Sequence, residues 1–199
     1  MPAAAPNTLQ QSVAKARAGC ATVKRPAPRT ETRKPPKRAF DPGKRYDVAL
    51  QTNCGGFTIR LDVRHSPHTT ASFAALARSH FFDKTIFHRI VPGFVIQGGD
   101  PNGSGSGGPG YTVVDTPPSD ARYVRGVVAM AKTGAEPPGT SGSQFFVVTG
   151  ADAGLPPDYA LLGKVTRGLD VVERIGRLGN PQTEQPKRRI VIRHITVTP

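Results

Sequence analysis

One stretch constrains the fold more than any other, an apolar run from Phe87 to Gln97 that is broken in its middle by Pro92-Gly93. Aromatic and β-branched residues dominate it, which favours strand over helix. Proline followed by glycine is a turn signal, so we predict two short strands joined by a turn. A glycine-rich loop follows at 98–110. The run also contains Arg89, and because a guanidinium keeps its charge, this residue is either paired to a carboxylate or kept for a substrate.

The chain from Tyr46 onward shows further short strands and two helices. Alternating apolar and polar residues, as in Phe57 to Leu61, are typical of a half-buried strand. Ser66-Pro67 begins one helix pattern, and apolar residues at helical spacing from 168 to 178 predict a second helix. These elements predict a mainly β protein folded as a closed antiparallel β-barrel. Other strands are expected at 46–51, 124–130, 144–149, 160–165 and 189–197, with a loop at 136–142 and a register irregularity near His194.

The first 45 residues differ in composition from the rest. They hold 11 Lys/Arg and 2 Asp/Glu, whereas residues 46–199 hold 16 and 12, so a net charge of +9 out of +13 lies in this leader. Its prolines forbid a long regular element, and we predict a disordered or extended segment with a short helix near 9–18, followed by a domain at 46–199. Charge alone could bring the leader to nucleic acid or an anionic membrane. Almost no aromatic residue interleaves the charges, so we expect a solvated linker and no specific nucleic-acid partner.

The two cysteines bear on the compartment. Cys20 and Cys54 have neither CxxC spacing nor a histidine partner, so they do not indicate a metal site. They either form a disulfide that pins the leader to the barrel edge, or remain two separate thiols. A disulfide would place the protein in the cell envelope or outside the cell, and separate thiols suit the cytoplasm. No apolar run approaches the length of a membrane span, and the first twenty residues lack a signal-peptide core.

Several common chemistries are not indicated. The glycine-rich loop lacks the Gly-Lys-Ser/Thr ending of a phosphate-binding loop. Asp100 to Ser104 resembles the start of a calcium loop, but Tyr111 stands where the bidentate glutamate belongs. No Gly-x-Ser-x-Gly motif is present, and His88 should point to the opposite face from Arg89. We therefore expect no metal, no cofactor and no Ser-His-Asp triad.

Five motifs resemble the cyclophilins, the peptidyl-prolyl cis-trans isomerases, in order and spacing. They are FHRIVPGFVIQGGDP (87–101), GSGSGGPGY (103–111), GVVAMAKTG (126–134), SGSQFFVVT (141–149) and LLGKVTRGLDVVERI (161–175). The resemblance extends from roughly Asp47 to the end of the chain. It implies an eight-stranded antiparallel β-barrel capped by two α-helices, and an enzyme that rotates Xaa-Pro bonds in flexible or unfolded protein segments and so assists folding.

That reaction requires few functional groups from the protein. Rotation about an Xaa-Pro bond faces a barrier of about 18–20 kcal/mol from amide resonance. A donor aimed at the prolyl nitrogen lowers it, and an apolar pocket holds the ring. Arg89 suits the donor role, and the resemblance makes it the catalytic residue. Candidate substrate-binding residues, from the chemistry and the resemblance together, are Phe94, Val95, Gln97, Ala131, Lys132, Gln144, Phe146, Leu155 and Tyr159.

The chain departs from the family pattern at several of these positions. Val95, Lys132 and Tyr159 stand where many members have Met, Asn and His, respectively. Gly154 stands where drug-sensitive members have Trp, and the chain has no Trp, so we expect weak cyclosporin binding. Two alternatives to the enzyme remain: a module that binds proline segments without turnover, and a charge-driven scaffold whose binding would depend on residues 1–45 and on salt. Nothing in the sequence indicates oligomerisation, so we expect a monomer.

Overall fold

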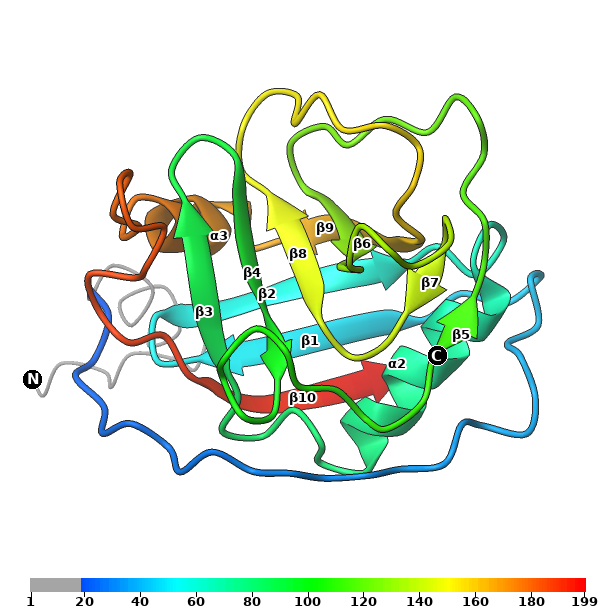
Figure 1. Ribbon diagram of the computed structural model, residues 1–199, viewed down its shortest axis with the longest axis horizontal. Coiled ribbons are helices and arrows are strands. Elements are labelled where there is room, and N and C mark those ends of the chain that lie inside the picture. The colour runs from blue at the N-terminus through cyan, green and yellow to red at the C-terminus, as the bar shows by residue number, and fades with distance from the viewer. Residues whose placement is uncertain (1–18) are drawn as a thin grey trace, which may run out of the picture.

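The computed structural model describes residues 19–199, and the helix expected near 9–18 lies outside them. The structure is mainly β, with an eight-stranded antiparallel sheet, a two-stranded sheet and two helices (Figure 1). The helices are α2 (Pro67–Arg78) and α3 (Leu169–Gly176). The strands are β1 (Asp47–Thr52), β2 (Gly55–Leu61), β3 (Ile86–Val91), β4 (Val95–Asp100), β5 (Val113–Val114), β6 (Val127–Met130), β7 (Thr140–Ser141), β8 (Phe145–Val148), β9 (Leu161–Arg167) and β10 (Ile192–Thr198).

The large sheet curls into a barrel that stays open along one seam. Its strand order is β10-β1-β2-β9-β6-β8-β4-β3, so β10 and β3 are its edges. The edges meet only through local contacts, among them an isolated bridge between Ile86 and Val191 and a 2.9 Å hydrogen bond from Ile192 N to Thr85 O. The predicted architecture of eight strands and two helices is confirmed, but the prediction of a closed barrel overstates how far the sheet closes. The residues beside β3, at 184–191, form a loop rather than a strand, so no continuous ladder joins the edges within residues 19–199.

The core lies inside the barrel, and the helices cover it from opposite sides in the view of Figure 1. Phe73 of α2 stacks on Phe82 at 4.6 Å and meets Phe145 of β8 edge-on at 5.4 Å. Each of these three rings is almost fully buried, and burying such a side chain contributes about 1.5–3 kcal/mol. On α3, Val172 and Ile175 are fully buried, as the helical spacing of apolar residues predicts. Neither helix of the described residues has the length and hydropathy that a membrane crossing requires.

Two local features test the finer predictions. The irregularity expected near His194 is confirmed, because the register of β1 against β10 shifts between Gln51 and Thr52, opposite His194 and Ile192. The uninterrupted loop expected at 136–142 is wrong in part, because β7 lies within it and pairs with β5. Both strands have two residues, which is too short for any alternating pattern to show in the sequence.

Residues 19–46 contain no helix or strand and run as an extended segment, blue in Figure 1, along one edge of the molecule. A disulfide joins Cys20 to Cys54, at the turn between β1 and β2. Further along the segment, Arg29 Nη2 donates to the carbonyl oxygen of Asp83 at 2.7 Å. The segment is therefore fixed to the barrel by a covalent bond at one end and by hydrogen bonds along its course.

Candidate active site

A pocket lies on the face of β4, β6 and β8 that points away from the barrel core. Successive side chains of a strand point to opposite faces, so Ile96 joins the main core while Val95 and Phe146 belong to a second apolar cluster on the other face. The pocket measures about 280 Å³. It is lined by Arg89, Phe94, Val95, Gln97, Ala131, Lys132, Phe146, Leu155 and Tyr159. All the site residues predicted from the sequence, except Gln144, thus meet in one place.

Arg89 of β3 is held on two sides. Its Nε donates to Glu184 Oε2 at 2.6 Å, and its Nη1 donates to Gln97 Oε1 at 3.3 Å. The guanidinium carbon lies 6.0 Å from the centroid of the Phe94 ring, within the range of a cation–π contact. Nη2 donates to no atom of the described chain. The sequence left a choice between a carboxylate partner and a substrate, and this geometry allows both, because one edge is paired and Nη2 remains available.

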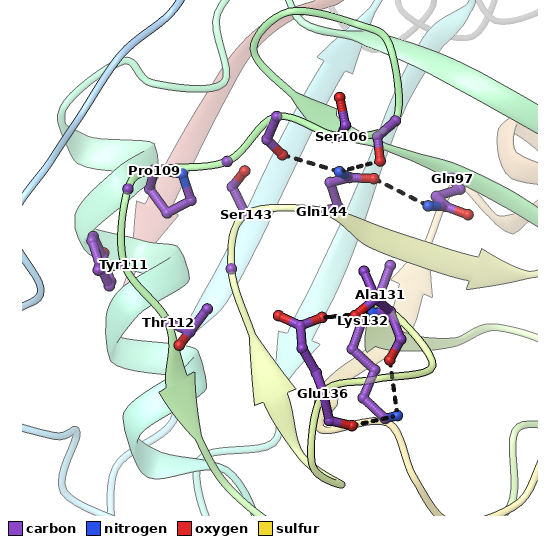
Figure 2. Close-up of a pocket in the computed structure, with 16 residues that line it drawn as sticks. Gln97, Ser106, Pro109, Tyr111, Thr112, Ala131, Lys132, Glu136, Ser143 and Gln144 are labelled. Carbon is purple, nitrogen blue, oxygen red and sulfur yellow. Dashed lines mark hydrogen bonds between the residues drawn. The ribbon is translucent and has the colours of Figure 1, made fainter.

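Two glutamines extend this arrangement into a chain of hydrogen bonds (Figure 2). Gln97 Nε2 donates to Gln144 Oε1 at 3.2 Å, and Gln144 Nε2 donates to the carbonyl oxygens of Gly105 and Gly107 at 2.9 and 3.0 Å. Each bond fixes the amide orientation of the next residue. The backbone of the glycine-rich loop therefore sets the rotamer of Gln97, which in turn presents an oxygen to Arg89.

Gln144 itself lines a neighbouring, larger cavity of about 460 Å³. One wall of this cavity is the glycine-rich loop, and Gln97, Ala131 and Lys132 line both cavities. Of the two cavities, only the smaller pocket is lined by Arg89 and the aromatic wall. Because both amide hydrogens of Gln144 are used by the loop, its contribution in this structure is to join the two cavities.

A buried carboxylate organises the glycine-rich loop. Asp100 is fully buried, and its oxygens accept the backbone N–H groups of Asn102, Ser104, Gly105 and Gly107 at 2.6 to 3.2 Å. These bonds use the acceptor sites that a calcium ion would need. A Cβ at residue 107 would lie 2.1 Å from Asp100 Oδ1, so the loop can wrap its carboxylate only with glycine there.

Lys132 lines the pocket, but its ammonium group is bonded to the backbone of its own loop. Its ammonium donates to the carbonyl oxygens of Thr133 and Glu136 at 3.3 and 3.1 Å. It also lies 5.6 Å from the centroid of the Tyr159 ring and 3.8 Å from an oxygen of Asp158. Its side chain is only 5% exposed. The charge is thus tied into its own loop, and it holds the Tyr159 wall of the pocket.

Tyr123 packs against the pocket residue Tyr159, and no sequence motif identified it as a candidate. It is fully buried and packs edge-on against Tyr159 at 5.8 Å. Its hydroxyl donates to the Tyr159 carbonyl oxygen at 2.6 Å and accepts from the Tyr159 N–H at 2.9 Å. Burial raises the pKa of this phenol to about 12, so it remains protonated and keeps the donor that fixes Tyr159.

His88 adds no charge to the site. Burial lowers the pKa of its imidazole and outweighs the opposing effect of the Asp100 charge, while the neighbouring Arg89 charge lowers it further, so the ring is neutral at pH 7. Gly105 of the glycine-rich loop lies beside it, where a Cβ would be 3.6 Å from His88 Nε2. Arg89 therefore has no cationic histidine beside it.

Glu184 is the second residue that sequence reasoning missed. It lies in the loop before β10, 95 positions from Arg89, and adopts a left-handed backbone with φ of 58°. Its carbonyl accepts the N–H of Ile90 at 2.8 Å, which fixes the loop against β3. The sequence indicated only that an arginine in an apolar strand could require a carboxylate partner, and it did not show which carboxylate.

Comparisons with known proteins show the family and the fold. A model of the family "Cyclophilin type peptidyl-prolyl cis-trans isomerase/CLD" matches residues 47–197. The chain belongs to the cyclophilin-type peptidyl-prolyl cis-trans isomerases. A peptidyl-prolyl cis-trans isomerase of Arabidopsis thaliana is 35% identical over 150 residues, covering 73% of this cyclophilin and 90% of the relative. Peptidyl-prolyl cis-trans isomerase B of Streptomyces anulatus is 36% identical over 169 residues, covering 75% and 95%.

Solved structures show the same fold. A Cryptosporidium parvum cyclophilin superposes with a TM-score of 0.72 at 32% identity, covering 78% of this cyclophilin and 99% of the other chain. A second structure of that protein, in the presence of the dipeptide Ala-Pro, gives a TM-score of 0.70 at 31% identity, covering 77% and 99%. The resemblance in the motifs is thereby confirmed, and this cyclophilin is an isomerase of Xaa-Pro bonds.

Proposed function

We propose that this cyclophilin isomerises Xaa-Pro bonds with Arg89 as the hydrogen-bond donor to the prolyl nitrogen. The observation that carries the proposal is the guanidinium on the pocket wall, fixed by Glu184 and Gln97 and with Nη2 available. When the nitrogen lone pair accepts a hydrogen bond it leaves conjugation with the carbonyl, and the C–N bond loses the double-bond character that makes the barrier. Because the donor is already oriented, little reorganisation is needed in the transition state.

The apolar wall supplies the rest of the site. Phe94, Phe146 and Leu155 line the pocket and suit the ring of a proline. The ring centroids of Phe146 and Tyr159 lie 5.5 Å apart in an edge-on contact, and this contact restricts the movement of both rings. Such a dry wall strengthens the hydrogen bond from Arg89. The substrates are proline-containing peptides and flexible or unfolded protein segments, because a surface pocket reaches an Xaa-Pro bond only where that bond is exposed. Isomerisation of a short Xaa-Pro peptide, compared with Arg89→Ala, tests the assignment.

Glu184 should act as a positioning residue for Arg89. Glu184→Gln keeps the size and an acceptor oxygen but removes the charge, so we expect kcat/KM to fall about three- to tenfold. The free energy of unfolding should change by less than about 1 kcal/mol, because both side chains are partly exposed. Peptide isomerisation kinetics and urea unfolding measure the two quantities.

A matched control separates positioning from a general charge effect. Glu173→Gln removes the carboxylate that pairs with Arg125 at 3.4 Å, away from the pocket, and should leave kcat/KM unchanged. In an Arg89→Ala background, Glu184→Gln should have no further effect, because the pair acts as one unit. Additive losses in the double variant would contradict the positioning role.

Cyclosporin should inhibit this cyclophilin weakly. Gly154 stands where drug-sensitive members have Trp, and a Cβ at this position would contact nothing within 4 Å, so the pocket edge is open there. The backbone of Gly154 is left-handed, with φ of 62°, and this conformation disfavours larger residues. Gly154→Trp would therefore be strained and would not simply restore the drug contact. An inhibition titration against the peptide reaction measures this, and a constant close to that of sensitive members would refute it.

The disulfide supports an oxidising compartment, the cell envelope or the outside of the cell. We divide the chain into a basic leader, 1–45, and an isomerase domain, 46–199, with the described part of the leader fastened to the domain. Among residues 19–199, Val114 is the one large apolar side chain that is mostly exposed, which supports a monomer.

A further inference from the structure

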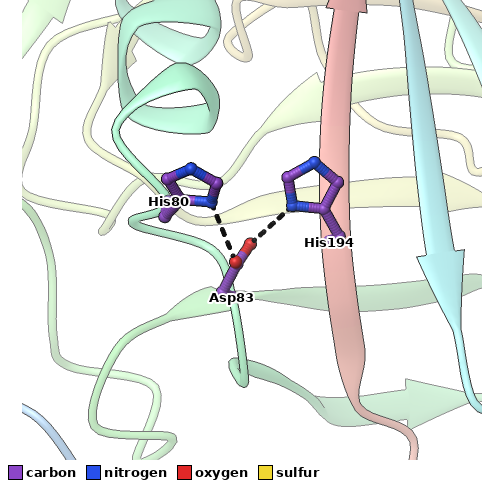
Figure 3. A group of neighbouring side chains, drawn as sticks. All are labelled: His80, Asp83 and His194. Carbon is purple, nitrogen blue, oxygen red and sulfur yellow. Dashed lines mark hydrogen bonds and ion pairs between the residues drawn. The ribbon is translucent and has the colours of Figure 1, made fainter.

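Two histidines and an aspartate meet at the open seam of the barrel, away from the residues of the pocket. His80 and Asp83 come from the segment that follows α2 and leads to β3, and His194 lies on β10 (Figure 3). One ligand atom from each lies within 4.8 Å of the others. His80 Nδ1 is 3.0 Å from Asp83 Oδ2, and His194 Nδ1 is 3.4 Å from Asp83 Oδ1. Figure 3 shows both imidazole rings facing the carboxylate from opposite sides.

The aspartate has unused capacity to accept. Asp83 Oδ1 is buried, and its 3.4 Å contact with His194 Nδ1 does not make a hydrogen bond, which leaves a carboxylate oxygen unsatisfied at a cost in free energy. The backbone at His80 is left-handed, with φ of 58°, and its imidazole faces the Asp83 carboxylate (Figure 3). An unsatisfied buried oxygen between two imidazoles is therefore a position at which a cation would be stabilised.

We propose that His80, Asp83 and His194 bind a divalent first-row transition metal ion, with Zn²⁺ as the representative member. Two imidazole nitrogens and one carboxylate suit zinc, nickel or copper better than magnesium or calcium. Bonds of about 2.0–2.1 Å in a tetrahedron place ligand atoms about 3.3 Å apart. The two histidine–carboxylate distances, 3.0 and 3.4 Å, are close to this value, and the three ligand atoms lie within 4.8 Å of one another. The histidines are 66% and 43% exposed in their side chains, so an ion can enter and a water can take the fourth position.

The surrounding charges permit the ion. Arg29 Nη2 donates to the Asp83 carbonyl oxygen at 2.7 Å, and this nearby cation opposes metal binding. Its charge is offset in part by Glu31, which lies 2.6 Å from Arg29 Nη1 and also 2.7 Å from Arg33 Nη2. Asp83 is thus the remaining local anion that faces both imidazoles, and the ion would give it the partner that it lacks.

The site would join the two edges of the sheet. Next to it, Lys84 N donates to Ile192 O at 2.8 Å, and Ile192 N donates to Thr85 O at 2.9 Å. A metal ion held by His80 and Asp83 on one edge and His194 on the other would add a cross-link where the hydrogen-bond ladder is interrupted. Because the unfolded chain does not assemble these ligands, binding should stabilise the folded state.

Calorimetric titration of the metal-free, full chain with zinc chloride at pH 7.5 tests the site. We expect one ion per chain with micromolar or tighter affinity. His80→Asn tolerates the left-handed backbone, and His194→Gln changes an exposed strand position, and each should weaken binding by about tenfold or more. Zinc should raise the melting temperature of the wild-type chain but not of either variant.

The chain offers a matched control. His65 Nδ1 is 2.8 Å from Asp62 in the same i, i+3 arrangement, but no second histidine joins this pair. His65→Gln should therefore leave zinc affinity unchanged. Both cysteines are held in the disulfide and provide no competing thiolate. The proposal would be overturned if the wild-type chain did not bind zinc. It would also be overturned if His80→Asn and His194→Gln bound zinc as tightly as the wild-type chain, or if His65→Gln lost as much affinity as those two variants.

Discussion

Arg89→Ala should lower kcat/KM for an Xaa-Pro peptide by about a hundredfold to a thousandfold, the typical cost of removing one preorganised donor from a transition state. The pocket itself should survive, because its apolar wall is built by side chains of β4, β8 and the 155–159 loop. Peptide binding should therefore persist while turnover collapses. A protease-coupled or NMR exchange assay measures the rate, and a titration without turnover measures the affinity.

Arg89→Lys provides the control for charge without geometry. A lysine keeps the positive charge but cannot donate to Glu184 and to the substrate from a rigid planar group. We expect a loss close to that of Arg89→Ala, which would show that orientation, not charge alone, lowers the barrier. Equal turnover by the wild-type chain and Arg89→Ala would remove Arg89 from the mechanism. Peptide binding without acceleration by the wild-type chain would indicate a proline-binding module.

Replacing both cysteines should destabilise the fold by about 2–4 kcal/mol. The disulfide closes a loop between residues 34 positions apart, and a loop of that length restricts the unfolded chain by about this amount. The melting temperature of Cys20→Ser/Cys54→Ser should fall by about 4–16 °C. The double variant avoids a leftover thiol. Calorimetry or urea unfolding in parallel with the reduced wild-type chain measures the effect.

The cross-link and the hydrogen bonds of the leader can be separated. Arg29→Gln removes the guanidinium that donates to the carbonyl oxygens of Phe81 and Asp83 but keeps the disulfide, so its loss should be smaller, near 1 kcal/mol or about the value of one or two hydrogen bonds. Neither change touches the pocket, and kcat/KM at 25 °C should be unaffected in both. An unchanged unfolding midpoint in the double cysteine variant would show that the cross-link adds no stability.

Local patterns determined the elements and most of the pocket. The apolar run broken by Pro92-Gly93 gave β3, its turn and β4, because strand preference and turn chemistry act over a few residues. Arg89 and Gln97 were recognised as site residues for the same reason: they lie on this one hairpin, where the alternation of a strand fixes which side chains share a face. The resemblance to the cyclophilins then supplied Tyr159 and the roles of Phe146 and Leu155.

Only the tertiary structure decided which distant residues meet. Glu184 reaches Arg89 across 95 positions, Tyr123 holds the backbone of Tyr159, and His194 joins His80 at the seam. No periodicity encodes such contacts, because they depend on strand register and on how loops cross the edges of the sheet. The same is true of the seam, since its opening depends on a loop beside β3 that interrupts the ladder. The sequence thus determined the elements and the chemistry available, and packing decided which charged groups became partners, because burial leaves each of them few alternatives.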